Sequence, residues 1–165
     1  MKLTDIQNKN PILYVLVGLP GSGKSTWTRA INKDGSFTIV SSEKHARSQG
    51  LTYSDVFDAY SKTATVLMNQ KFKEAVANND NIIWDQTNMT AKKRKNILMQ
   101  IPKNYKKIAV VFKIDEAELQ ARLDKRSKDE GKTIPPFVMT SMARSFEMPT
   151  KAEGFNEVIQ ANFST

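Results

Sequence analysis

The stretch Ile12-Leu-Tyr-Val-Leu-Val17, followed at once by Gly18-Leu-Pro-Gly-Ser-Gly-Lys-Ser-Thr26, decides the fold of this chain. The first part is a continuous apolar and β-branched run ended by glycine, which is typical of a strand buried on both faces of a parallel sheet. The second part fits the pattern G-x-x-x-x-G-K-[ST], and helical spacing begins at Lys24. A strand before this pattern and a helix after it distinguish a phosphate-binding loop from a glycine-rich turn without function.

The loop chemistry explains why these residue types are needed. Glycines let the backbone curl so that its N–H groups point at a β-phosphate, and the helix N-terminus adds a partial positive charge. We expect Lys24 to bridge the β- and γ-phosphates and the Ser25 hydroxyl to ligate Mg²⁺. The expected phosphate-binding residues are Gly18, Gly21, Ser22, Gly23, Lys24, Ser25 and Thr26.

A second acidic group near the metal is expected at the end of a neighbouring strand. Asp85 follows the apolar run Asn81-Ile-Ile-Trp84 and occupies such a place. We predict that it acts on Mg²⁺ or on the water around the ion. The alternative is that Asp85 only caps the next helix.

Composition excludes several classes of protein. The chain has 165 residues with no cysteine and one histidine, so disulfides, cysteine or multi-histidine metal sites and cysteine nucleophiles are ruled out. The net charge of +8 favours an anionic partner, nucleic acid or nucleotide ahead of membrane lipid, although solubility alone could explain it. The polar segment 1–11 has no signal-sequence core and no run is long enough to span a bilayer, so we expect a cytoplasmic protein.

Strand-like and helix-like segments alternate along the chain. The expected strands are 12–17, 37–41, 81–85, 107–114 and 156–160, and the expected helices are 24–33, 53–76, 92–99, 116–128 and 137–146. Alternation with short connections predicts an α/β fold, a doubly wound and mostly parallel sheet of five strands. We expect a polar tail over 1–11 and one domain over 12–165.

Several motifs occur in a fixed order: Gly18 to Thr26, Asp85-Gln-Thr-Asn88 with Arg94, a charged helix with Arg122 and Arg126, and Phe146-Glu-Met-Pro149 with Glu153-Gly-Phe155. In this order they resemble the 5′-polynucleotide kinase family, which includes phage enzymes, over about residues 12 to 160. The Asp-Gln-Thr-Asn variant is also similar to the kinase-like module of heterogeneous nuclear ribonucleoprotein U.

The resemblance implies a P-loop kinase domain with strand order 2-3-1-4-5 and a basic helical lid. It implies transfer of the ATP γ-phosphate to the 5′-hydroxyl of RNA or DNA with Mg²⁺, a reaction that needs mainly positioning and charge neutralisation. Arg126 matches a family arginine on a lid over the phosphates, and Arg122 lies one turn earlier on the same helix face. Without the resemblance, this charged helix would be read as a solvated surface.

The acceptor side departs from the family pattern, which has an aspartate after the second strand as general base and an arginine three residues later. Direct alignment places Ser42 and His45 there, whereas a shift by one residue supplies Glu43 but then meets Ala46. We choose Glu43 as the base and Arg47, four residues on, as the clamp on the acceptor phosphate. His45 as the base, or a plain helix start with an internal ion pair, are the alternatives.

Basic side chains gather in 92–95, 103–107 and 122–132, and binding of a nucleic-acid strand to such charges would weaken as salt rises. We interpret Lys103, Lys106 and Lys107 as turn and solubility charges. We expect Asn88 and Arg94, which matches a family arginine, to line the active site and bind the acceptor. No protein partner is indicated. Two alternatives to a 5′-polynucleotide kinase are a P-loop kinase for a nucleoside or small metabolite, and a nucleotide-dependent RNA-binding module with little transfer activity.

Overall fold

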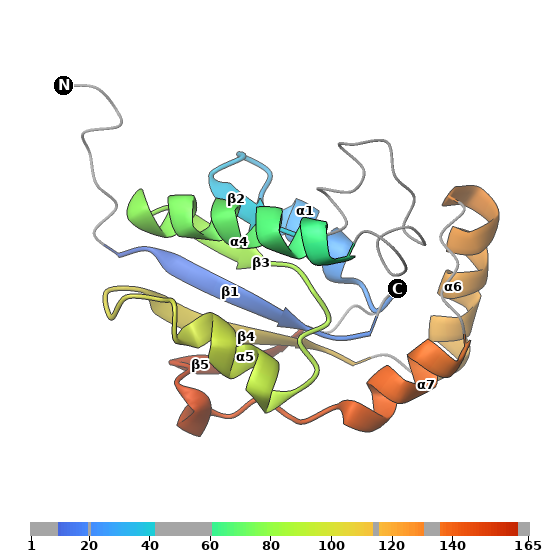
Figure 1. Ribbon diagram of the computed structural model, residues 1–165. Coiled ribbons are helices and arrows are strands. Elements are labelled where there is room, and N and C mark those ends of the chain that lie inside the picture. The colour runs from blue at the N-terminus through green and yellow to red at the C-terminus, as the bar shows by residue number, and fades with distance from the viewer. Residues whose placement is uncertain (1–9, 20, 42–60, 114–115, 131–135, 162–165) are drawn as a thin grey trace.

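A five-stranded sheet with the order β2-β3-β1-β4-β5 forms the centre of the computed structural model (Figure 1). The structure describes residues 10–19, 21–41, 61–113, 116–130 and 136–161. Its strands are β1 Ile12–Val17, β2 Phe37–Val40, β3 Asn81–Trp84, β4 Lys106–Phe112 and β5 Glu157–Ala161. Every neighbouring pair is parallel, so the predicted order 2-3-1-4-5 is confirmed and "mostly parallel" becomes fully parallel.

Helices cover both faces of the sheet. The helices within the described residues are α1 Lys24–Ile31, α4 Ser61–Ala77, α5 Ala91–Leu98, α6 Glu116–Glu130, α7 Pro136–Ser145 and the short 3₁₀ helix η2 Lys151–Glu153. In Figure 1, α4 and α5 lie in front of the sheet and α1 lies behind it. The helices α6 and α7 lie beyond the arrowheads, past the carboxyl ends of the strands. That edge also carries the loop between β1 and α1.

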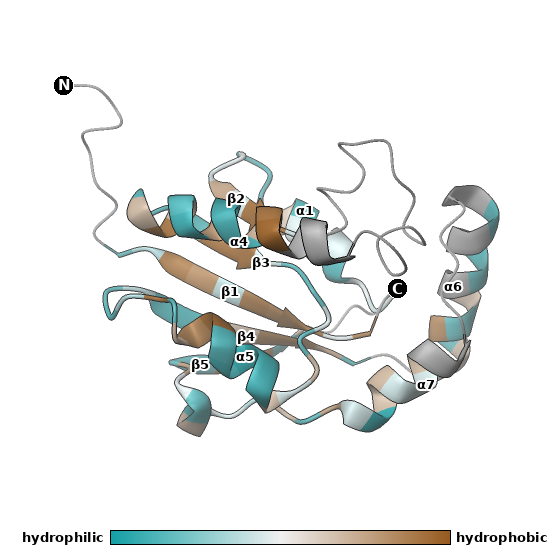
Figure 2. Cartoon of the chain, viewed as in Figure 1, coloured by the Kyte–Doolittle hydropathy of each residue, from teal (hydrophilic) through white to brown (hydrophobic). Residues whose placement is uncertain are grey.

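Two apolar cores hold these layers together, one on each face of the sheet. On the α4 and α5 face, Phe72 contacts Trp84 edge to face with ring centres 4.7 Å apart. On the opposite face, Trp27 of α1 makes similar edge contacts with Tyr14, at 5.0 Å, and with Phe112. In Figure 2 the central strand β1 is largely brown and the helix α5 largely teal, as expected for a sheet whose centre is covered on both faces. Burial of each large apolar side chain stabilises the fold by about 1.5–3 kcal/mol.

The observed elements follow the predicted ones closely. The strand 12–17 is confirmed residue for residue, and the other compared bounds differ by no more than two residues. The start of the long helix predicted from residue 53 lies outside the described residues, and η2 was not predicted. Within the part of the chain that the structure describes, no helix is both long and apolar enough to cross a bilayer.

Candidate nucleotide-binding and phosphotransfer site

The loop after β1 packs closely against β4 and the segment after β3. The N–H of Gly18 donates to the carbonyl oxygen of Thr87 at 3.0 Å, which ties the loop to the segment after β3. A Cβ on Gly18 would lie 2.7 Å from Ser22 Oγ and 2.9 Å from Phe112 Cβ. Real Cβ atoms essentially never come this close to another heavy atom. Glycine is therefore required at this position by space.

The other end of the loop leads directly into α1. Gly21 and Gly23 have φ angles of 83° and 107°, a left-handed conformation that L-residues with side chains adopt reluctantly. Gly23 is the N-cap of α1, and its carbonyl accepts from the N–H of Trp27 at 3.1 Å. The first N–H groups of a helix have no partner within the helix and carry a partial positive charge, so this end of α1 suits an anion.

The Lys24 ammonium lies over the loop. Its Nζ donates to the carbonyl oxygens of Gly18 at 2.6 Å and of Leu19 at 3.2 Å. The side chains of Ser25 and Thr26 are exposed. Among the described residues, Ser22 Oγ is one of two buried side-chain atoms without a hydrogen-bond partner. A lysine ammonium held by the backbone at the start of the loop, with the exposed hydroxyl of Ser25 at the start of α1, fits a polyphosphate carrying Mg²⁺.

Asp85 lies at the same edge of the sheet. Val15 on β1 is level with Trp84 on β3, so Asp85, one residue further along, leaves the sheet beside the end of β1. Its N–H donates to the carbonyl oxygen of Val40 at 2.8 Å, and its side chain is half-buried. No group of three His, Cys, Asp or Glu side chains gathers within the described residues. Phosphate oxygens and water would therefore have to complete any magnesium site here.

Asp85 does not cap the helix that follows it, α5. The N-cap of α5 is Thr90, whose Oγ1 accepts from the N–H of Lys93 at 3.2 Å. Asp85 lies five residues before that cap and begins the connection from β3. The predicted role of Asp85 on Mg²⁺ or its water stays a prediction.

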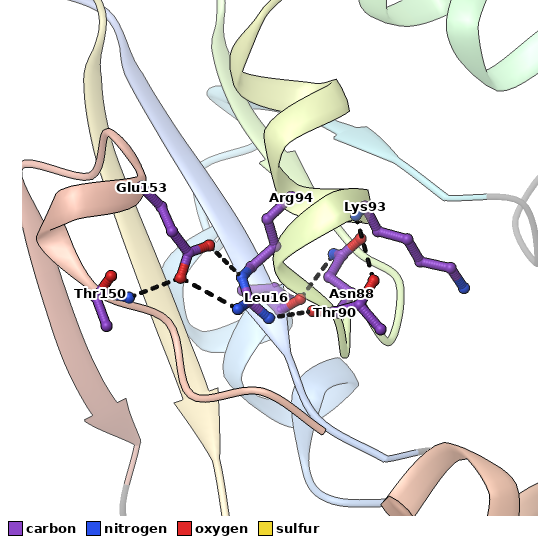
Figure 3. A network of polar contacts seen from close by, with 7 residues as sticks. All are labelled: Leu16, Asn88, Thr90, Lys93, Arg94, Thr150 and Glu153. Carbon is purple, nitrogen blue, oxygen red and sulfur yellow. Dashed lines mark hydrogen bonds and ion pairs between the residues drawn. The ribbon is translucent and has the colours of Figure 1, made fainter. Parts of the chain in front are cut away.

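The surroundings of Arg94 differ from our expectation. Its side chain is completely buried, with Nε donating to Glu153 Oε1 at 2.8 Å and Nη2 donating to Oε2 at 3.2 Å (Figure 3). Its Nη1 donates to the carbonyl oxygen of Asn88 at 2.9 Å. A guanidinium that is inaccessible and engaged in this way cannot touch an acceptor strand in this conformation. We correct the expected role of Arg94 from substrate contact to internal contact.

Asn88 is buried as well, with 2% of its surface exposed. Its backbone has φ 47°, and its Nδ2 donates to the carbonyl oxygen of Leu16 at 2.7 Å and to that of Gln86 at 3.4 Å. The amide therefore fastens the loop after β3 to the end of β1. It does not line an open acceptor site here, so that expectation is corrected too.

Other predicted site residues have no described geometry. The acceptor segment with Ser42, Glu43, His45 and Arg47 lies outside the described residues. Arg122 and Arg126 belong to α6, which lies past the carboxyl ends of the strands in Figure 1, but their side chains are also outside the described part. Their roles stay predictions. By contrast, Lys92, Lys93 and Lys95 are described, and all three are exposed on α5.

The pairing of Glu153 with Arg94 is the contact that sequence reasoning missed, although Glu153 belongs to one of the ordered motifs. Thr150 and Glu153 form a capping box around η2, in which the N–H of Thr150 donates to Glu153 Oε2 at 2.9 Å. The T-x-x-E pattern could have indicated this turn. Nothing in the sequence indicated that the same carboxylate reaches Arg94, which lies 59 residues away.

Comparisons with known proteins show the family and the fold of the chain. A family model described as an AAA domain matches residues 13–149. Mouse heterogeneous nuclear ribonucleoprotein U-like protein 2 is 28% identical over 158 residues, which covers 88% of this chain and 21% of that protein. The L-seryl-tRNA(Sec) kinase of Methanococcus maripaludis is 28% identical over 145 residues, covering 84% of this chain and 53% of the kinase. The chain thus spans about a fifth to a half of these curated relatives.

A solved structure of the Pnkp1/Rnl/Hen1 RNA repair complex contains a similar fold. The TM-score is 0.70 with 24% sequence identity, and the match covers 87% of this chain and 46% of the other. At this identity the likeness establishes the fold alone, a parallel sheet with P-loop kinase topology.

Proposed function

The chain belongs to this AAA domain family, and from that premise we propose that it is a P-loop phosphotransferase that moves the ATP γ-phosphate to the 5′-hydroxyl end of RNA or DNA. The observation that carries the proposal is the placement of Lys24 over a glycine loop at the carboxyl edge of a parallel sheet. In open α/β sheets, ligands bind at this edge. Phosphoryl transfer needs mainly charge and positioning there.

The residues have distinct parts in the proposed reaction. Lys24 exchanges its contacts with Gly18 and Leu19 for oxygens of the β- and γ-phosphates. Bound Mg²⁺ neutralises phosphate charge. Ser25 and Asp85 are the residues that would hold the ion, directly or through water. Arg126, with Arg122 beside it, closes over the phosphates from α6.

The acceptor is activated from the segment after β2. The 5′-oxygen forms the new bond to the γ-phosphorus while the bond between that phosphorus and ADP breaks, and the hydroxyl proton passes to the carboxylate of Glu43. Arg47 holds a phosphate of the acceptor strand. The net charge of +8 and the exposed Lys92, Lys93 and Lys95 on α5 support a nucleic-acid acceptor. The RNA repair complex and the seryl-tRNA kinase among the similar proteins support RNA in particular.

The test is transfer from labelled ATP to oligonucleotides with a 5′-hydroxyl end. We expect Lys24→Ala to lower transfer by about a hundredfold or more, because it removes a cation aimed at the developing charge. Lys106→Ala is the matched control, since Lys106 begins β4 at the opposite edge of the sheet and is exposed. In the same assay, Glu43→Gln and His45→Ala decide between the two candidate bases. Transfer that survives in Lys24→Ala, or that needs only a nucleoside or sugar as acceptor, contradicts the proposal.

A second candidate is a nucleotide-dependent RNA-binding module with little or no transfer. The 28% identity with the ribonucleoprotein favours it. Its signature would be RNA binding by the unaltered protein that falls steeply with salt, without labelled product under any condition.

A further inference from the structure

A buried network joins three segments that are far apart in the sequence (Figure 3). Arg94 on α5 holds Glu153 of η2 through two nitrogen atoms and the carbonyl oxygen of Asn88 through a third. Asn88 in turn holds the carbonyl oxygen of Leu16 near the end of β1. The network therefore runs from the turn before β5, through the connection after β3, to the strand that leads into the phosphate-binding loop.

The conformation at Asn88 depends on these contacts. A φ of 47° is uncommon for a residue other than glycine, although Asn tolerates it better than most. The backbone carbonyl of Asn88 accepts from Arg94, and its side-chain amide donates to the carbonyl oxygen of Leu16. The backbone and the side chain of Asn88 are therefore both held by hydrogen bonds. Together with the bond from Gly18 N–H to Thr87, this fixes the segment that Asp85 begins relative to the loop that carries Lys24.

Arginine is the side chain that can make all these contacts at once. Its planar group presents several donors in a fixed fork, whereas the lysine ammonium is a compact point charge. Glu153 is itself oriented by the N–H of Thr150, and it is the more accessible partner, with 16% of its side chain exposed. It lines a hollow of about 490 Å³ together with Ala91, Lys92, Lys95 and Ala152. Polar substitutions at Glu153 can therefore be solvated from this side.

We propose that Arg94 is a positioning residue, which through Asn88 sets the distance between Asp85 and the loop of Lys24. The proposal rests on the proposed function, because the distance matters if Asp85 serves a metal bound with the nucleotide. Weakening the network changes how magnesium supports nucleotide binding and transfer. It leaves the phosphate-binding loop itself in place.

The test compares three variants with a control on the same helix. Arg94→Lys keeps the charge and loses the fork. Glu153→Gln keeps the shape and loses the ion pair. Asn88→Gly keeps the φ angle without strain and loses the amide bond to Leu16. Asn96→Ala is the control, since Asn96 is exposed on α5.

Two readouts do not depend on transfer. The first is binding of a fluorescent ATP analogue with and without Mg²⁺. The magnesium concentration for half-maximal effect should rise about ten- to a hundredfold in the three variants, as for other residues that orient metal ligands, with binding in its absence changed less than about twofold. The second is hydrogen exchange, which should become faster at 16–18, 85–88 and 150–153 in the variants and stay unchanged in described segments outside the network. Asn96→Ala should resemble the unaltered protein in both.

A double variant, Arg94→Lys with Asn88→Gly, should need no more magnesium for half-maximal effect than the more affected single variant. Both substitutions break the same chain of contacts, so their effects should not add. Unchanged magnesium dependence in folded Arg94→Lys and Asn88→Gly, or exchange that rises evenly through the molecule, would overturn the proposal. Neither readout needs an acceptor. If the unaltered protein transfers no phosphate, the proposed function is refuted, and the two readouts still test the positioning role of Arg94.

Discussion

Replacing Gly18 with alanine tests the geometry of the loop directly. The added Cβ would meet Ser22 Oγ at 2.7 Å, Phe112 Cβ at 2.9 Å and the carbonyl oxygen of Phe112 at 3.2 Å. The serine hydroxyl can rotate away, but both atoms of Phe112 are fixed to the backbone of β4. Gly18 or β4 must therefore move, and overpacking of this kind costs about 1–3 kcal/mol.

Urea unfolding measures this cost. With a slope of about 2 kcal/mol per M, a loss of 2 kcal/mol lowers the midpoint by about 1 M. For a chain of 165 residues each kcal/mol also lowers the melting temperature by about 2–4 °C. Because Ser22 belongs to the phosphate-binding loop, we expect nucleotide affinity to fall together with stability.

Gly35→Ala is the matched control. Gly35 has φ 72°, and a Cβ there would meet nothing within 4 Å. This variant should cost about 1–2 kcal/mol through backbone strain alone. Gly35 lies just before β2, at the amino ends of the strands, whereas the phosphate-binding loop lies at their carboxyl ends. Nucleotide affinity should therefore not change in Gly35→Ala. The reasoning is refuted if Gly18→Ala unfolds and binds nucleotide like the unaltered protein, or if Gly35→Ala loses affinity equally.

Two further substitutions test hydrogen bonds outside the phosphate-binding loop. Thr90→Ala removes the oxygen that caps the N–H of Lys93 and should cost about 1 kcal/mol in urea unfolding, whereas Thr90→Ser should cost little; equal losses would count against the cap. Tyr105→Phe removes the hydrogen bond to the carbonyl oxygen of Asp80 at 2.7 Å and should cost about 1 kcal/mol at neutral pH. Burial, and then the charge of Asp80, raise the pKa of Tyr105 from 10.0 to about 12. The neutral phenol is thus favoured in the folded state, and its contribution is complete below pH 10 and lost as the pH rises to about 12. Urea midpoints of the unaltered protein should fall more than those of Tyr105→Phe across this interval, and parallel curves would disprove the assignment.

Much of the fold could be predicted because local signals agree with one another. The run 12–17 is apolar, β-branched and ended by glycine, and it became β1 without a shift. Met68 and Phe72 lie four residues apart in the helix predicted over 53–76, so helical spacing puts them on one face, and both are buried. Strand order came from the family resemblance, since alternation of elements does not determine it.

The predicted acceptor contacts of Arg94 could not be judged from sequence in the same way. Arg94 stands among the exposed Lys92, Lys93 and Lys95, and composition alone does not distinguish one cation from its neighbours. The signal that was available is spacing, because Arg94 lies three residues before the buried Ile97 and so points to the inner side of α5. Its partner Glu153 is far away along the chain, and pairing over that distance is decided by the fold.

The contacts of Lys24 with the backbone of its own loop bear on which anions the loop selects. The ammonium is already satisfied by two carbonyl oxygens, so an incoming anion competes with the loop's own backbone for the same cation. Net affinity is the difference between two sets of bonds. A single phosphate offers few oxygens with which to exceed that internal competitor, whereas a chain of phosphates reaches the ammonium and the start of α1 together. We therefore expect the loop to bind a chain of phosphates more tightly than a single phosphate.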